Sequence, residues 1–127
     1  MTIDWAHFTP WASLAGVQIT AGIAAAEVEA AVRMYLGALR EAMQMLERGE
    51  PFTKHHQVQG KRNMAYAAHL AIQAVQRLYN DAGGRVLYTD NELQRKFRDV
   101  HAAAAHHSLH WHTAAEEYGS YVLGADE

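Results

Sequence analysis

Apolar side chains recur at helical spacing through most of the sequence. Between Pro10 and Pro51 they return at steps of three and four residues, the pattern of one face of an α-helix. The members of this stripe are Val28, Val32, Tyr35, Leu36, Leu39, Met43 and Leu46. Pro10 favours a helix start, and Gly49 before Pro51 favours a stop. Gly16 and Gly22 either weaken the pattern or permit close packing, so we expect one long helix or two in this segment.

A second apolar stripe predicts another helix over residues 64–79, after a polar connection at residues 51–63. This helix should end near Gly83 and Gly84, because glycine can adopt the left-handed conformation of a helix C-cap. The next four residues, 85–88, predict a short extended segment or a turn.

Two shorter helices are predicted toward the C-terminus. Residues 89–91 contain three candidate N-caps for a helix over residues 92–108, and a last helix should run from about residue 109 to 121. The sequence contains no alternating pattern of strand length. We therefore expect an all-α fold, an up-down bundle of three to five helices.

Composition and charge narrow the class of protein. The 127 residues suit one domain, expected to span residues 1–127, with an ordinary globular balance of 50% hydrophobic and 20% charged residues. Cysteine is absent, which removes disulfides, zinc–thiolate sites and cysteine nucleophiles. The net charge is −3 and the 11 basic residues are scattered, so we expect no nucleic-acid partner. The sequence has neither a secretory signal nor a membrane span, so we expect a cytoplasmic protein.

Five histidines crowd into the stretch RDVHAAAAHHSLHWH at residues 98–112. His106 and His110 stand four residues apart, so their rings can meet on one helix face and chelate a metal. A site would need further ligands, and no glutamate in the sequence precedes a histidine by three residues, the spacing used in helical di-metal bundles. A His-Glu-x-x-His motif is also missing. We therefore expect no metal site.

Acid–base chemistry is the second interpretation of the stretch. His107 and His110 are three residues apart and share a helix face, and a pKa near neutrality suits histidine to proton transfer. Ser108 lies between them, and Trp111 adds an aromatic plate beside four successive alanines that leave the backbone open. Together they suit one wall of a pocket for a planar ring. Arg98, with Arg95 and Asp99, forms either a cofactor clamp or an ion-pair set on a helix surface. The simpler alternative is that these histidines are surface or core residues without a chemical function.

Residues 78–119 resemble the C-terminal helical domain of the acyl-CoA dehydrogenase superfamily, and specifically its flavin-dependent monooxygenase branch. That branch includes the oxygenase components of two-component aromatic hydroxylases and the dibenzothiophene-type monooxygenases. The resemblance extends more loosely back to Pro10. The residues that fit the order of the family motif are Gly83, Gly84, Leu93, Arg95, Arg98, Asp99, His101, His107, His110 and Trp111.

The resemblance implies a reduced flavin, FMN or FAD, as cofactor and a small aromatic or polycyclic substrate. His107 and His110 would face the isoalloxazine ring, where they would stabilise a flavin hydroperoxide or move the substrate proton. Arg98, Ser108 and Trp111 would be the cofactor-binding residues. The family often has an aspartate directly after the tryptophan, whereas this sequence has a histidine there, so an Asp–His pair is not expected.

The resemblance also concerns partners. The family builds its flavin site from three domains, and we expect neither the N-terminal helical domain nor the middle β-domain within these 127 residues. A separate flavin-domain partner would then be required, and the domain itself is expected to form a homo-oligomer. Two alternatives stay open: a cofactor-free cyclase or isomerase with His107 and His110 as general acid and base, and a non-catalytic oligomerisation module.

Overall fold

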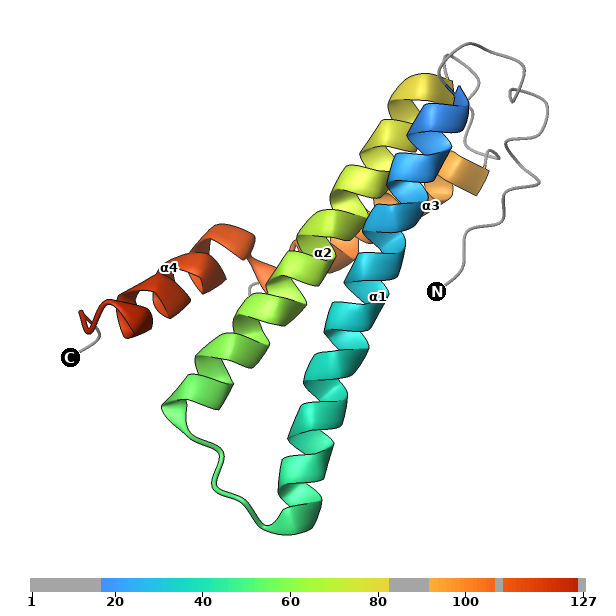
Figure 1. Ribbon diagram of the computed structural model, residues 1–127. Helices are drawn as coiled ribbons and strands as arrows, with labels where there is room; N and C mark the ends of the chain where they lie inside the picture. The colour runs from blue at the N-terminus through green and yellow to red at the C-terminus, as the bar shows by residue number, and fades with distance from the viewer. Residues whose placement is uncertain (1–16, 83–91, 107–108, 126–127) are drawn as a thin grey trace.

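The computed structural model describes residues 17–82, 92–106 and 109–125, and these residues form four helices without a strand. The helices are α1 (Val17–Arg48), α2 (Lys54–Ala82), α3 (Glu92–Ala104) and α4 (Trp111–Val122) (Figure 1). The predicted all-α fold is confirmed. Of these helices, none has the length and apolar character needed to cross a membrane.

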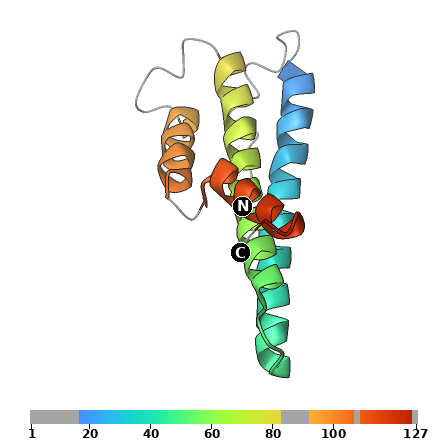
Figure 2. The ribbon, with the colours of Figure 1, turned by 90° about the vertical axis from the view of Figure 1, so that its left-hand side faces the viewer.

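The helix α2 lies at the centre of the arrangement. Helix α1 runs antiparallel to it as the other arm of a long hairpin, and α3 lies along the opposite side of its upper half (Figure 2). Helix α4 crosses the lower half of α2 at a wide angle rather than running alongside it. The main contacts of α1, α3 and α4 are all with α2, so this one helix positions the other three.

Helix α1 is a single helix over its described length, and glycine ends it as predicted. Gly49 has a φ of 65°, and its N–H bonds the carbonyl oxygen of Leu46 at 3.2 Å. The Glu50 N–H bonds the carbonyl oxygen of Met45 at 3.0 Å. This pair of hydrogen bonds is the Schellman arrangement, in which a left-handed residue satisfies the last carbonyls of a helix.

Helix α2 begins ten residues before the predicted start, so the prediction of a polar connection through residue 63 is wrong. Thr53 supplies the start signal. Its Oγ1 accepts from the His56 N–H at 3.4 Å, and its own N–H donates to His56 Nδ1 at 3.3 Å. This reciprocal pair is a capping box with histidine in the place usually held by glutamate or glutamine, which explains why the sequence pattern missed it. Thr53 Oγ1 also lies 2.7 Å from His56 Nδ1, so the hydroxyl and the backbone N–H of Thr53 both contact the same ring nitrogen.

Small residues form the contact between α1 and α2. Ala24 is fully buried and packs in a cluster with Ala74 and Leu78 of α2, and Ala31 packs further along in a cluster with Ala67. Alanine at these positions allows the two helix backbones to approach closely. We call this contact the alanine seam.

Several larger apolar side chains of α1 face outward instead, although Met45 is buried. Met43 is 61% exposed and Leu46 is 82% exposed, although the apolar pattern had marked both as part of a helix face. Monomeric proteins rarely expose contiguous apolar patches of this kind. We call this surface the α1 stripe, and its members are Tyr35, Leu36, Leu39, Met43 and Leu46.

The last two helices are shorter than predicted. Helix α3 ends at Ala104 rather than 108, and α4 begins at Trp111 rather than 109. Between them, the His106 N–H bonds the carbonyl oxygen of Ala103 at 3.3 Å, and the Leu109 N–H bonds that of His106 at 2.9 Å. Residues 107 and 108 lie outside the described residues. The predicted segment at 85–88 does so too.

Substituting Thr53→Ala should lower the free energy of unfolding by about 1 kcal/mol, because it removes the oxygen that caps α2. Urea denaturation measures this change. Thr113→Ala, at an exposed position inside α4, is the control and should leave stability unchanged or slightly higher. Equal stability of the Thr53→Ala variant and the native chain would show that His56 and Thr53 do not cap the helix.

Substituting Ala24→Leu should lower the free energy of unfolding by about 1–3 kcal/mol, because the buried seam has no room for the added atoms. Ala26→Leu lies on the exposed side of the same helix and should change stability by less than about 0.5 kcal/mol. Thermal or urea unfolding compares the two variants. If both were tolerated equally, α1 would not pack on α2 through this face.

Candidate functional site

The predicted site falls on the segment that joins α3 to α4. His110 is the residue before α4, with an extended backbone at φ −68° and ψ 109° and an exposed side chain. Its side chain makes no capping hydrogen bond. Trp111 follows as the first residue of α4. His107 and Ser108, the other two predicted members of this segment, lie outside the described residues.

Trp111 is half-buried against two rings of α2. Its ring centroid lies 4.9 Å from that of Tyr66 and 5.8 Å from that of His69. The Tyr66 and His69 rings stack on each other at 6.1 Å, and the Gln73 amide bonds His69 Nε2 at 3.1 Å. We call Tyr66, His69 and Trp111 the Trp111 stack. Because aromatic contacts of this kind add to the burial of apolar area, the stack holds the first turn of α4 on α2 and so sets the position of His110.

Two further contacts hold α4 across α2. Lys61 Nζ lies 2.8 and 2.9 Å from the two carboxylate oxygens of Glu117. The Arg62 guanidinium lies 3.9 Å from the ring centroid of Tyr118, a cation–π distance. The start and the middle of α4 are therefore both fixed to the central helix.

Arg98 lies on α3 with an exposed side chain, as does Asp99. Arg95, the other member of the proposed clamp, donates instead to Glu92 Oε1 at 2.6 Å. The Arg95 guanidinium lowers the pKa of Glu92, and Lys96 at 3.4 Å lowers it further. Because its pKa is lowered, the ionised Glu92 carboxylate stabilises the fold at pH values above the ordinary pKa of glutamate. This contribution is lost as the pH falls through the lowered pKa. Arg95 thus belongs to an ion-pair set on the helix surface.

His101 has a better-defined setting than the sequence pattern suggested. Its Nδ1 lies 2.8 Å from the carbonyl oxygen of Phe97, and its ring lies 4.2 Å from that of Phe97, which in turn contacts Tyr79 at 4.3 Å. A carbonyl only accepts, so Nδ1 carries the proton and Nε2 keeps a lone pair in the neutral ring. The four-residue spacing of Phe97 and His101 was the available signal.

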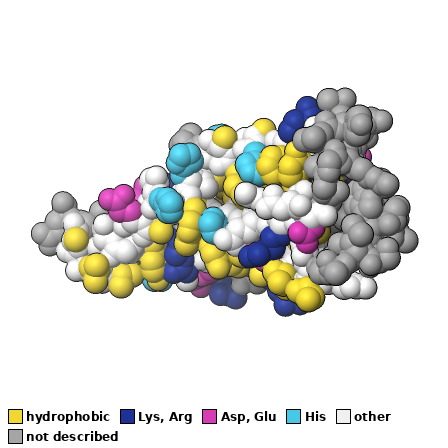
Figure 3. All heavy atoms as spheres, turned by 90° about the horizontal axis from the view of Figure 1, so that it is seen from above, with side chains coloured by type: hydrophobic (Ala, Val, Ile, Leu, Met, Phe, Trp, Pro, Cys, Tyr) yellow, Lys and Arg dark blue, Asp and Glu magenta, His cyan; other side chains and the backbone are white. Residues whose placement is uncertain are grey.

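The remaining histidines of the segment do not gather into one group. His106 and His112 are exposed like His110, and Figure 3 shows several separate histidine patches on the face that it draws. Within the described ranges, no three histidine, aspartate or glutamate side chains converge as metal ligands would. The described part of the segment is therefore an open surface beside an aromatic stack.

Residues 7–111 match a family model described as "Acyl-CoA dehydrogenase, C-terminal domain". Among curated proteins, the chain is 28% identical over 114 residues to the oxygenase component of an FADH(2)-dependent resorcinol hydroxylase from Rhizobium sp. (strain MTP-10005), covering 87% of this chain and 28% of that protein. It is 33% identical over 89 residues to a pigment production hydroxylase from Rhodococcus erythropolis, covering 70% of this chain and 22% of the relative. The chain thus spans about a quarter of the length of these relatives.

Two solved structures share the fold. The HsaA monooxygenase from M. tuberculosis superimposes with a TM-score of 0.81 at 23% identity, covering 94% of this chain and 34% of that protein. The 3-HSA hydroxylase from Rhodococcus sp. RHA1 gives a TM-score of 0.83 at 24% identity, with 94% and 32% covered. At these identities the likeness concerns the helical arrangement.

Substituting Trp111→Ala should lower the free energy of unfolding by about 2 kcal/mol, because it removes the ring that packs on Tyr66 and His69. Amide hydrogen exchange should also become faster along the first turns of α4. Trp111→Phe keeps an aromatic ring and should cost less than about 1 kcal/mol. Unchanged stability and unchanged exchange in the alanine variant would mean that the stack does not hold α4.

Proposed function

The chain belongs to the acyl-CoA dehydrogenase C-terminal domain family, and we propose that it serves as the helical, cofactor-facing module of a flavin-dependent aromatic monooxygenase. The support for this activity is the character of its curated relatives, which include an FADH(2)-dependent hydroxylase and a p-hydroxyphenylacetate 3-hydroxylase. In this proposal the substrate is a small aromatic or polycyclic molecule, and hydroxylation is the reaction.

The observation that carries the proposal is the placement of His110. Trp111 anchors the residue directly before it on α2, so an exposed imidazole stands beside a fixed aromatic ring. In our proposal His107 and His110 face the isoalloxazine ring of reduced FMN or FAD, with Arg98, Ser108 and Trp111 as further cofactor contacts. Histidine can hold or pass a proton near neutral pH, which suits either the substrate hydroxyl or the cofactor edge. The flavin, when bound, would supply the activation of oxygen.

The described surface fits one wall of such a site rather than a complete one. The side chains of His106, His110 and His112 are all exposed, so the part of the chain described here does not itself enclose a planar cofactor around them. Catalysis of this kind requires water to be excluded from the cofactor. We therefore propose that other polypeptide, corresponding to the greater length of the relatives, supplies the remaining walls.

The α1 stripe supports a homo-oligomer as part of the same proposal. Its five large apolar side chains cover one face of a long helix, and a second copy of the chain offers a matching apolar face. A cytoplasmic location, which the absence of cysteine permits, completes the proposal.

The proposed cofactor contact predicts that reduced flavin binds to the chain, alone or mixed with the N-terminal part of the resorcinol hydroxylase relative. Anaerobic calorimetry with reduced FMN and FAD measures the affinity. His110→Ala should weaken binding about tenfold, equivalent to about 1.4 kcal/mol, whereas His112→Ala, also exposed, should change it less than about twofold.

If neither reduced FMN nor reduced FAD bound to the chain, either alone or mixed with the N-terminal part of the relative, the flavin proposal would be wrong. Turnover of a substrate without flavin, lost in a His107→Ala, His110→Ala double variant, would favour the cofactor-free enzyme instead.

The proposed oligomer predicts that sedimentation velocity finds the native chain larger than a monomer. Leu36→Lys combined with Met43→Lys should shift it to the monomer, since both side chains lie on the α1 stripe. Leu123→Lys changes a leucine outside the stripe that is more exposed than either of these side chains, and it should leave the oligomer intact. A native chain that sediments as a monomer at every concentration would contradict the proposal.

A further inference from the structure

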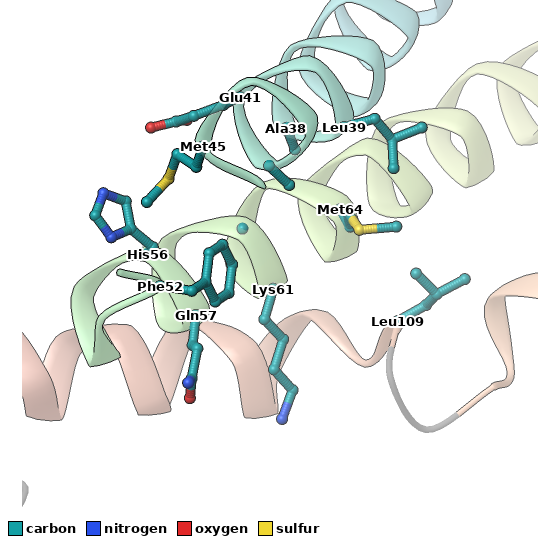
Figure 4. A pocket seen from close by; sticks show the side chains of 12 residues that line it. Ala38, Leu39, Glu41, Met45, Phe52, His56, Gln57, Lys61, Met64 and Leu109 are labelled. Carbon is teal, nitrogen blue, oxygen red and sulfur yellow. The ribbon is translucent and has the colours of Figure 1, made fainter. Parts of the chain in front are cut away.

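A cavity of about 380 Å³ lies between α1 and α2 near the turn of the hairpin. The two helices diverge toward this turn, and Leu109, two residues before α4, adds to the lining of the cavity (Figures 1 and 4). A volume of this size falls in the range that holds a small organic molecule. Of the described residues in the histidine segment, Leu109 is the one that lines the cavity. The cavity is therefore separate from the proposed cofactor-facing surface.

The walls of the cavity are apolar and adaptable. Phe52 presents its ring in the middle of the cavity, with Met45 on one side and Met64 and Leu109 on the other (Figure 4). Met45 is buried, whereas half of the Phe52 side chain is exposed at the mouth. Methionine side chains are flexible and polarisable, so their sulfur atoms make favourable contacts with aromatic rings. Aromatic side chains such as that of Phe52 also pack favourably against a second ring. This lining favours a flat, apolar ring.

The wall formed by α2 has an open place at Gly60. A Cβ built on this glycine would meet no atom within 4 Å. Glycine inside a helix costs about 1 kcal/mol relative to alanine, and the surrounding fold does not require its small size. The missing side chain therefore keeps free volume in the cavity rather than room for a neighbouring helix.

The polar groups of the cavity do not favour a charged ligand. Lys61 already holds the Glu117 carboxylate with its ammonium group, and Glu41 adds a second carboxylate at the edge. His56 has its Nδ1 engaged by Thr53, so Nε2 is the ring nitrogen left to face a ligand, and Gln57 offers an amide. One lysine against two carboxylates leaves no excess positive charge to bind an anion, while a single hydroxyl or carbonyl group finds donors here.

We propose that this cavity is a binding site for a small uncharged aromatic molecule that carries one hydroxyl or carbonyl group. The ring lies among Phe52, Met45 and Met64 and over Gly60, and its polar group faces His56 or Lys61. The site is independent of the flavin proposal, because it uses neither His107 nor His110.

The test uses the intact chain with ¹³C-labelled methionine methyl groups and 2-naphthol as the probe. Titration should shift the methyl resonances of Met45 and Met64 to saturation. The resonance of Met34, which packs against the core cluster of Ala31 and Ala67, should stay in place. So should that of Met43, on the α1 stripe. The anion 2-naphthoate should bind about tenfold more weakly, because burying its carboxylate near Glu41 is unfavourable.

Two glycine variants make the test specific. Gly60→Leu fills the cavity and should abolish the shifts at Met45 and Met64 without lowering the free energy of unfolding; Gly60→Ala, a smaller change, should weaken them. Gly37→Leu is the matched control, since it also lies inside a helix with open space around its Cβ but does not line the cavity.

Three results would overturn the site: no saturable shift in the native chain, an unchanged response in Gly60→Leu, or shifts at Met45 and Met64 that depend on protein concentration alone. The last result would mean that a second copy of the chain fills the cavity. Since flavin takes no part in this experiment, its failure is distinguishable from failure of the proposed function.

Discussion

The close packing of other helices on α2 is the constraint from which the remaining features follow. The alanine seam brings α1 against α2 at positions where the side chains end at Cβ. The larger side chains of α1 are consequently left for other surfaces. Five of them form the exposed α1 stripe, and one of these, Leu39, also lines the cavity near the hairpin turn together with the buried Met45.

The same central helix connects packing to chemistry. Tyr66 and His69 on α2 receive Trp111, and Lys61 on α2 receives Glu117, so α4 is fixed by its first turn and its middle. This attachment sets the position of His110, since the His110 side chain makes no capping hydrogen bond to α4. In the proposed monooxygenase module, the aromatic stack would therefore be the element that presents the imidazole to the cofactor.

The sequence carried much of the fold but less of the site. Periodicity and glycine chemistry located the body of each helix and the stop at Gly49, because these signals are local. The start of α2 escaped, because a histidine completes the capping box where glutamate is usual. Which face of α1 is buried could not be read either, since alanines and large apolar residues both recur at helical spacing and only the partner helix decides between them. For the site, the sequence pointed to Trp111 as an aromatic plate, but its partners Tyr66 and His69 lie more than forty residues away and needed the tertiary structure.

The central claim, that the histidine segment faces a reduced flavin, is tested most directly by nuclear magnetic resonance of the histidine side chains under anaerobic conditions. With imidazole carbons labelled and reduced FMN added, together with the N-terminal part of a relative, we predict that the resonances of His107 and His110 shift together. That of His56, held in the helix cap, should not move. Shifts confined to His56, or none at any of the nine histidines, would contradict the claim.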